Sequence, residues 1–105
     1  MVRTMPDLPP PIDPDRLIHE PGRLTVLAVL NAVEEADFQF LLNQSGLTKG
    51  NLSSHTAKLE AAGYVEIEKA FVGKMPRTVY RLTADGRKAL EAYRRHMAGV
   101  LDAMS

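Results

Sequence analysis

The sequence predicts a mainly helical fold with one small β-hairpin, an α+β arrangement. The chain has 105 residues, a length that suits one domain. Apolar residues recur at helical spacing on both sides of a central stretch, residues 64–82, in which the period changes to two. We therefore expect a single domain over residues 13–105. Residues 1–12 contain four prolines, so we expect them to form a flexible arm.

The first two predicted helices begin at prolines. Asp13 and Pro14 are typical of an N-cap and a first helical residue, so a short helix is expected to about His19. Pro21 opens a longer helix to about Glu35. The apolar residues of this longer helix cover more than one face, which indicates burial on two sides. One side would face the core of the domain, and the other would need a partner.

The next segment predicts two helices joined by a short turn. Asp37 is the expected N-cap of a helix that Gly46 ends, and Thr48 is the expected N-cap of another that runs to about Ala62. Gly63 follows as a residue that adopts positive φ readily. Two helices joined by a few residues that include a glycine form a helix-turn-helix.

A hairpin and a last helix complete the chain. Apolar and polar residues alternate over 64–68 and 78–82, and the residues between these strands place a basic tip at Lys74 and Arg77. Thr83 is the expected cap of a helix over about 84–103. This order of elements is that of a winged helix-turn-helix, with a three-helix core, a wing and a long C-terminal helix for dimerisation.

The charge distribution favours a nucleic-acid partner although the net charge is zero. Residues 1–47 carry three basic and seven acidic residues, a net charge of −4. Residues 48–83 carry six basic and three acidic residues, a net charge of +3, and residues 84–105 have a net charge of +1. A local basic patch matters more for phosphate binding than the total charge does.

The candidate DNA-binding residues lie on the outward face of the helix after Thr48 and at the hairpin tip. Small polar and basic side chains suit a helix in the major groove, where Asn51 can pair with adenine and Lys49 can reach guanine or a phosphate. The alternative is an ordinary solvated helix face and turn, and the alternative for Arg81 is the outer face of its strand. The expected DNA-binding set is Thr48, Lys49, Asn51, Ser53, Ser54, His55, Lys58, Lys74 and Arg77.

A homodimer is the second partner that the sequence predicts. The last helix carries apolar residues at spacings of three and four at the end of a small protein, where little core remains to cover them. The alternative is that several of these residues complete the core of the same chain, as we expect for Leu90. The expected dimer interface is Leu24, Leu27, Val29, Tyr93, Met97, Val100, Leu101 and Met104.

Several segments resemble a known family. The runs over 47–55 and 58–65 are similar to the recognition helix and first strand of MarR-like and ArsR-like bacterial regulators. The junction formed by residues 80–83 with Gly86 and Leu90 resembles theirs as well, whereas Thr56 stands where they place a buried leucine. The resemblance implies a dimeric DNA-binding repressor with the wing on the flanking backbone or minor groove. It also implies a possible small-molecule effector.

Other classes of function have little support in the sequence. Cysteine is absent, the three histidines fall in separate elements, and there is no phosphate-binding glycine loop, so we expect no cofactor, no metal and no catalytic residues. No apolar run is long enough for a membrane span or a signal peptide, and we expect a cytoplasmic protein. A winged-helix adaptor that binds protein instead of DNA is the main alternative, and a small enzyme is the weaker one.

Overall fold

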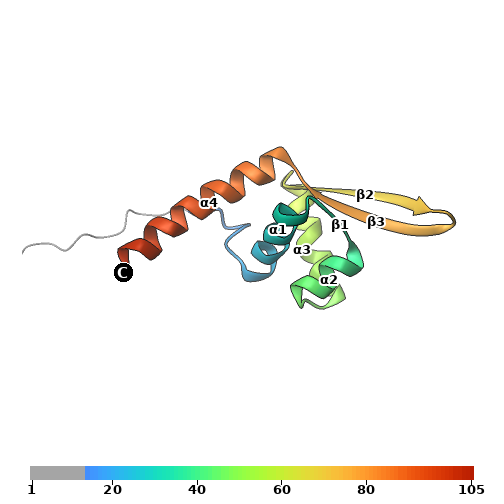
Figure 1. Ribbon diagram of the computed structural model, residues 1–105, viewed down its shortest axis with the longest axis horizontal. Coiled ribbons are helices and arrows are strands. Elements are labelled where there is room, and N and C mark those ends of the chain that lie inside the picture. The colour runs from blue at the N-terminus through green and yellow to red at the C-terminus, as the bar shows by residue number, and fades with distance from the viewer. Residues whose placement is uncertain (1–13) are drawn as a thin grey trace, which may run out of the picture.

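The computed structural model describes residues 14–105, which form four helices and a three-stranded antiparallel sheet (Figure 1). The predicted fold class is confirmed, whereas the proline-rich arm lies outside the described residues. None of the helices in residues 14–105 is both long and apolar enough to span a membrane. The elements are α1 (Pro21–Val33), β1 (Glu35–Asp37), α2 (Phe38–Ser45), α3 (Lys49–Ala61), β2 (Val65–Val72), β3 (Met75–Leu82) and α4 (Ala84–Ala103).

Side-chain oxygens cap the helices where the sequence predicts them. The Asp37 carboxylate accepts a hydrogen bond from Phe40 N–H at 2.8 Å and begins α2. The hydroxyls of Thr48 and Thr83 begin α3 and α4 in the same way. Each cap satisfies a backbone donor that has no partner within the helix. These three expectations therefore hold because a cap depends on only four consecutive residues.

The expected short helix before α1 is wrong. Residues 14–20 form a single turn, in which the Asp15 carbonyl accepts a hydrogen bond from His19 N–H at 2.8 Å. The turn cannot continue into α1 because a residue before proline avoids the helical region, and Glu20 has φ −151° and ψ 129°. The carboxylate of Glu20 instead caps α1. Asp13, the expected cap of the short helix, lies outside the described residues.

The sheet contains one strand more than predicted. The strand order is β1-β3-β2, and β1 pairs with β3 through Ala36 opposite Tyr80. Three residues between two helices resemble a connection in sequence, and they become a strand only because β3 offers an open edge. Strands β2 and β3 are also longer than expected, at eight residues each, so the wing turn is reduced to Gly73 and Lys74.

The two faces of the sheet have different chemistry. Val65, Ile67 and Tyr80 lie on the face that packs against the helices, as the alternation predicts. On the outer face, Arg81 donates hydrogen bonds to Glu68 at 2.7 Å and to Glu35 at 3.0 Å. Both hydrogen bonds raise the pKa of Arg81, and the bond to Glu68 has the larger effect. Arg81 therefore links the three strands.

The core lies between α1, α2, α3 and the inner face of the sheet. Thr56 is the one polar residue buried in the described chain, and its hydroxyl donates to the Leu52 carbonyl at 2.9 Å. The hydroxyl therefore has a hydrogen-bond partner within its own helix, and the core contains no unpaired polar group at this position. The fully buried side chains are Ile18, Val26, Leu27, Leu30, Leu41, Leu52 and Leu59.

The junction between the wing and α4 requires a glycine. Thr83 N–H donates to the Tyr64 carbonyl at 3.0 Å, and the Thr83 hydroxyl donates to the Gly63 carbonyl at 2.6 Å. These bonds hold the start of α4 so close to Tyr64 that a Cβ atom on Gly86 would lie 2.2 Å from the Tyr64 carbonyl oxygen. The opposing atom is backbone, so it cannot rotate away.

We expect Gly86→Ala to lower the free energy of unfolding by about 3 kcal/mol, the upper range for overpacking a tight site. The matched control is Gly50→Ala on α3, where nothing lies within 4 Å of the added Cβ. That variant should be neutral or more stable by up to about 1 kcal/mol, because alanine favours a helix. Urea unfolding followed by circular dichroism measures both, and equal effects would contradict the role of Gly86.

Candidate nucleic-acid interface

The polar face of α3 is exposed to solvent. Leu52, Thr56 and Leu59 turn the opposite face into the core. Because the spacing of these three residues matches the helical period, most of the positions between them point outward. The exposed members of the predicted set on this helix are Thr48, Lys49, Asn51, Ser53, Ser54 and Lys58.

His55 does not point outward as expected. Its side chain is only 17% exposed and lies against the start of α1. Arg23 Nη1 is 3.2 Å from His55 Nδ1, and because arginine can only donate, Nδ1 accepts this hydrogen bond. The expectation fails because His55 stands at the margin between the two faces of α3, where Gly22 has no side chain and leaves room for the ring. We therefore leave His55 out of the surface available to DNA.

The contacts of His55 connect α3 to the start of α1. His55 Nε2 is 3.6 Å from the Glu20 carboxylate that caps α1. Arg23 Nε in turn donates to the Leu17 carbonyl at 2.5 Å. The hydrogen bond from Arg23 N–H is the largest of the influences that lower the pKa of Glu20, so this carboxylate stays charged beside the histidine. The Glu20–Arg23–His55 cluster thus fixes how α3 sits on α1.

Segments distant in sequence are also held together by Tyr64 and Tyr93, whose hydrogen bonds the sequence did not indicate. The Tyr64 hydroxyl donates to the Asp15 carboxylate, and this hydrogen bond, with burial, raises the pKa of Tyr64 to about 12. The Tyr93 hydroxyl is hydrogen-bonded to His19 Nδ1 at 2.8 Å. Both contacts hold the turn before α1 against β2 and α4. No local pattern could have indicated them because their partners are more than 40 residues apart.

The two basic residues predicted for the wing differ in their surroundings. Lys74 occupies the tip of the turn, is exposed, and makes no ion pair within residues 14–105. Arg77 lies further back, and its Nε is 3.8 Å from the Asp37 carboxylate. Arg77 is therefore partly neutralised by an acidic neighbour, whereas Lys74 keeps its full charge toward solvent.

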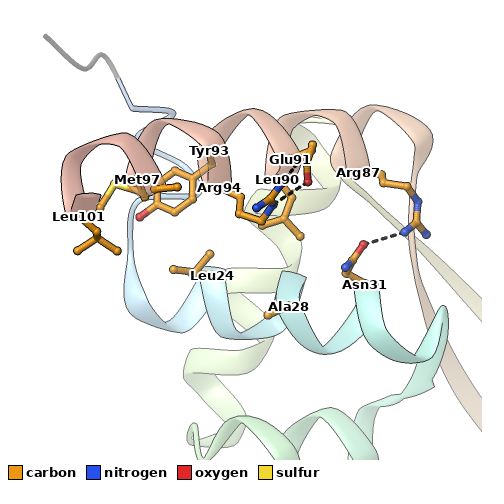
Figure 2. A pocket seen from close by; sticks show the side chains of 11 residues that line it. Leu24, Ala28, Asn31, Arg87, Leu90, Glu91, Tyr93, Arg94, Met97 and Leu101 are labelled. Atoms are coloured by element: carbon orange, nitrogen blue, oxygen red, sulfur yellow. Dashed lines mark hydrogen bonds and ion pairs between the residues drawn. The ribbon is translucent and has the colours of Figure 1, made fainter. Parts of the chain in front are cut away.

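A groove of about 740 Å³ separates α1 from α4 (Figure 2). Leu24 of α1 lies opposite Tyr93, Met97 and Leu101 of α4, and these four side chains form the apolar floor of the groove. Arg87 and Asn31 form a hydrogen bond of 2.7 Å toward one end, and Arg94 pairs with Glu91 beside the floor. Four of the residues predicted for the dimer interface therefore line one groove.

The other residues predicted for the dimer interface are divided between surface and core. Val29 and Val100 are half-buried, and Met104 is 75% exposed at the end of α4. Leu27 is fully buried in the core of its own chain, so its assignment to a dimer interface is wrong. The cause is that α1 is apolar around most of its circumference, and the sequence does not show which side faces inward. Leu90 packs against the core, as expected.

The histidines lie apart from one another. His19 contacts Tyr93, His55 contacts the start of α1, and His96 is exposed on α4. Within residues 14–105, no three histidine or carboxylate side chains gather as metal ligands would.

We expect His55→Ala to lower the free energy of unfolding by about 1–2 kcal/mol, because Arg23 and Glu20 lose a half-buried partner. His55→Gln keeps an acceptor for Arg23 and should recover part of this loss. Ser54→Ala, an exposed neighbour on the same helix, is the control and should change stability by less than about 0.5 kcal/mol. Thermal and urea unfolding measure all three variants. No difference between His55→Ala and Ser54→Ala would contradict the role of the cluster.

Comparisons with known proteins agree with this geometry. Residues 23–101 match the family described as winged helix DNA-binding domain. An uncharacterized protein of Methanocaldococcus jannaschii is 37% identical over 71 residues, which cover 68% of this chain and 77% of the relative.

Two solved structures share the fold. The transcriptional regulator homologue from Pyrococcus horikoshii has a TM-score of 0.81 at 28% identity, with 87% of this chain and 90% of that chain covered. A MarR-family transcriptional regulator from Silicibacter pomeroyi has a TM-score of 0.68 at 25% identity, with 85% of this chain and 59% of that chain covered. The chain therefore belongs to the winged helix DNA-binding family and is a MarR-like transcriptional regulator.

Proposed function

We propose that this protein binds specific double-stranded DNA sequences as a homodimer and represses transcription. The observation that carries the proposal is the exposed polar face of α3, opposite a face that is buried in the core. The major groove is about 12 Å wide and admits a helix whose outer side chains are short. Asn51 would pair with adenine, Lys49 would reach guanine or a phosphate, and Ser53 would donate to the backbone.

The distribution of free charge supports a DNA partner. Arg77 and Arg81 are paired with carboxylates, so they contribute less to the outward potential. The lysines of α3 and the wing have no such partners among the described residues. These lysines, which lie on the two elements that would contact DNA, are Lys49, Lys58, Lys69 and Lys74.

We assign the groove between α1 and α4 to a second copy of the chain. Its floor is apolar, and Leu101, which lines it, is 59% exposed on the part of α4 that extends away from the helical body (Figure 1). An apolar surface of this kind is stabilised by a partner. A two-fold dimer would place two α3 helices about 34 Å apart, one turn of the DNA helix.

Repression and a small-molecule effector rest on the resemblance to MarR-like regulators. Such a regulator would act in the cytoplasm, and its relatives among solved structures are regulators rather than enzymes. The alternative of a winged-helix adaptor makes a different prediction for a mobility-shift titration. DNA binding should weaken steeply as salt rises, whereas an adaptor would bind no duplex even at low salt. Selection from a random duplex pool should return two half-sites with two-fold symmetry.

We expect Asn51→Ala to relax base preference at one position of each half-site and to weaken binding by about 1–3 kcal/mol. The loss arises because alanine cannot form the paired hydrogen bonds with a base edge. Ala57→Ser, on the same exposed side of α3, is a control that adds one hydroxyl and removes no predicted contact. Fluorescence anisotropy on the selected duplex and on single-base variants measures both. An unchanged base preference would show that Asn51 does not contact a base edge.

Lys74→Ala should weaken binding to all duplexes about equally and reduce the slope of log affinity against log salt by about one. The reason is that a phosphate contact releases counterions without reading sequence. Lys88→Ala removes the same charge from an exposed position on α4 and should leave the slope unchanged. Titrations at four salt concentrations measure the slopes. Equal slopes for the two variants would contradict the contact at Lys74.

Leu101→Glu should convert the dimer to a monomer and weaken DNA binding, because it places a charge on the apolar surface assigned to the second copy. His96→Glu introduces the same carboxylate at an exposed position of α4 outside this groove and should remain dimeric. Sedimentation velocity measures the mass, and circular dichroism verifies the fold. A dimeric Leu101→Glu variant would show that the interface lies elsewhere.

A further inference from the structure

The tip of the wing is unexpectedly apolar. Phe71 is 73% exposed, Met75 is 70% exposed and Val72 is 61% exposed. These are three of the seven large apolar side chains that are exposed in residues 14–105. A turn that served only to connect two strands would carry polar residues. The exposed apolar surface therefore points to a contact that the proposed reading by α3 does not use.

The strand register places apolar groups on both faces of the tip. Val72 pairs with Met75, and Phe71 pairs with Pro76. Paired residues share a face and consecutive residues alternate, so these two pairs lie on opposite faces of the ribbon. The pair of Phe71 and Pro76 continues the face that the helices cover nearer the body. Beyond the helices this face has no cover within the described residues, since the wing projects from the body (Figure 1).

Positive charge surrounds the apolar tip. The sequence contains no acidic residue between Glu68 and Asp85. Lys74 forms the turn itself, and Lys69 lies on the same face as Phe71, two residues away. Neither lysine has an ion-pair partner within residues 14–105. An apolar tip with unpaired lysines beside it matches a surface that is anionic at its edges and apolar within.

The minor groove of DNA is a surface of this kind, with phosphates along both edges and sugars and bases inside. It is about 6 Å wide, whereas the two strands of a ribbon alone are about 4.8 Å apart before any side chain is added. The tip can therefore enter only if the groove widens. Proteins that insert apolar side chains at minor-groove base steps widen the groove and bend the duplex.

We propose that the wing tip is an apolar wedge, in which Phe71 and Met75 press against a base step in the minor groove that flanks the α3 site and bend the duplex. This inference rests on the proposed function, because it needs a duplex held by α3. Lys69 and Lys74 hold the phosphates on the two edges while the apolar side chains enter. The steps that unstack most easily are pyrimidine–purine steps, so selected duplexes should carry TA or CA at the flanking position.

The test compares the double variant Phe71→Ser/Met75→Ser with the wild-type protein on one selected duplex. The duplex carries a donor and an acceptor fluorophore at its two ends, so energy transfer reports bending, and anisotropy reports affinity. Wild-type protein should raise energy transfer. The double variant should bind at least about 10-fold more weakly, as expected for losing a packed apolar contact, and should not bend the duplex.

Two controls separate the wedge from other causes. Val33→Ser removes an exposed apolar side chain at the end of α1 and should bind and bend like the wild type. The salt slope of Phe71→Ser/Met75→Ser should equal that of the wild type, because no charge is removed. Thermal unfolding of each variant verifies that the fold is intact.

The possible failures are distinguishable. If the wild-type protein binds no duplex, the proposed function itself fails. If the double variant binds and bends the duplex like the wild type, the wedge is wrong and DNA binding by α3 stands. Wild-type protein that binds without bending overturns the wedge as well. Binding to phosphatidylserine vesicles that the double variant alone loses, with duplex binding unchanged, would assign the tip to a lipid surface instead.

Discussion

The packing of α3 against α1 is the constraint on which the rest of the structure depends. Leu52 and Leu59 of α3 are fully buried with the apolar residues of α1, and this burial decides which side of α3 turns toward solvent. A rotation of α3 by one residue, about 100°, would expose leucine and bury serine or lysine. The Glu20–Arg23–His55 cluster adds a directional contact to this apolar packing. The polar surface of α3 is therefore a consequence of what the helix buries.

Features set by neighbouring residues could be predicted from the sequence, whereas features set by distant contacts could not. The caps at Thr48 and Thr83 follow from hydroxyls placed three residues before a backbone donor. Strand β1 has no local signal in the sequence because its three residues pair with a segment more than 40 positions away. The surroundings of Leu27 and His55 depend on distant contacts in the same way. Apolarity around a whole helix does not show which side the core occupies, and a polar ring at a helix margin turns toward whichever neighbour leaves space.

The neutral net charge of the chain conceals a separation of charge in space. Acidic residues of β1 and β2 form ion pairs with Arg77 and Arg81 of β3. The lysines of α3 and of the wing tip lack such neighbours within the described residues. The acidic residues thus stabilise the sheet and leave the unpaired positive charge on α3 and on the wing tip. The total charge of a small regulator is a poor guide to its partner when carboxylates serve a structural role of this kind.

A single residue, Thr83, separates the end of β3 from the start of α4. The hydrogen bonds of Thr83 and the close approach of Gly86 to Tyr64 hold the two elements together at this point. We therefore expect the wing and α4 to move as one unit about Tyr64. In a pair of chains joined through their last helices, a small change in the crossing angle would be magnified into a larger change in the separation of the two wing tips. In such a pair, the spacing of the half-sites would be tied to the geometry of association, because no flexible linker joins β3 to α4.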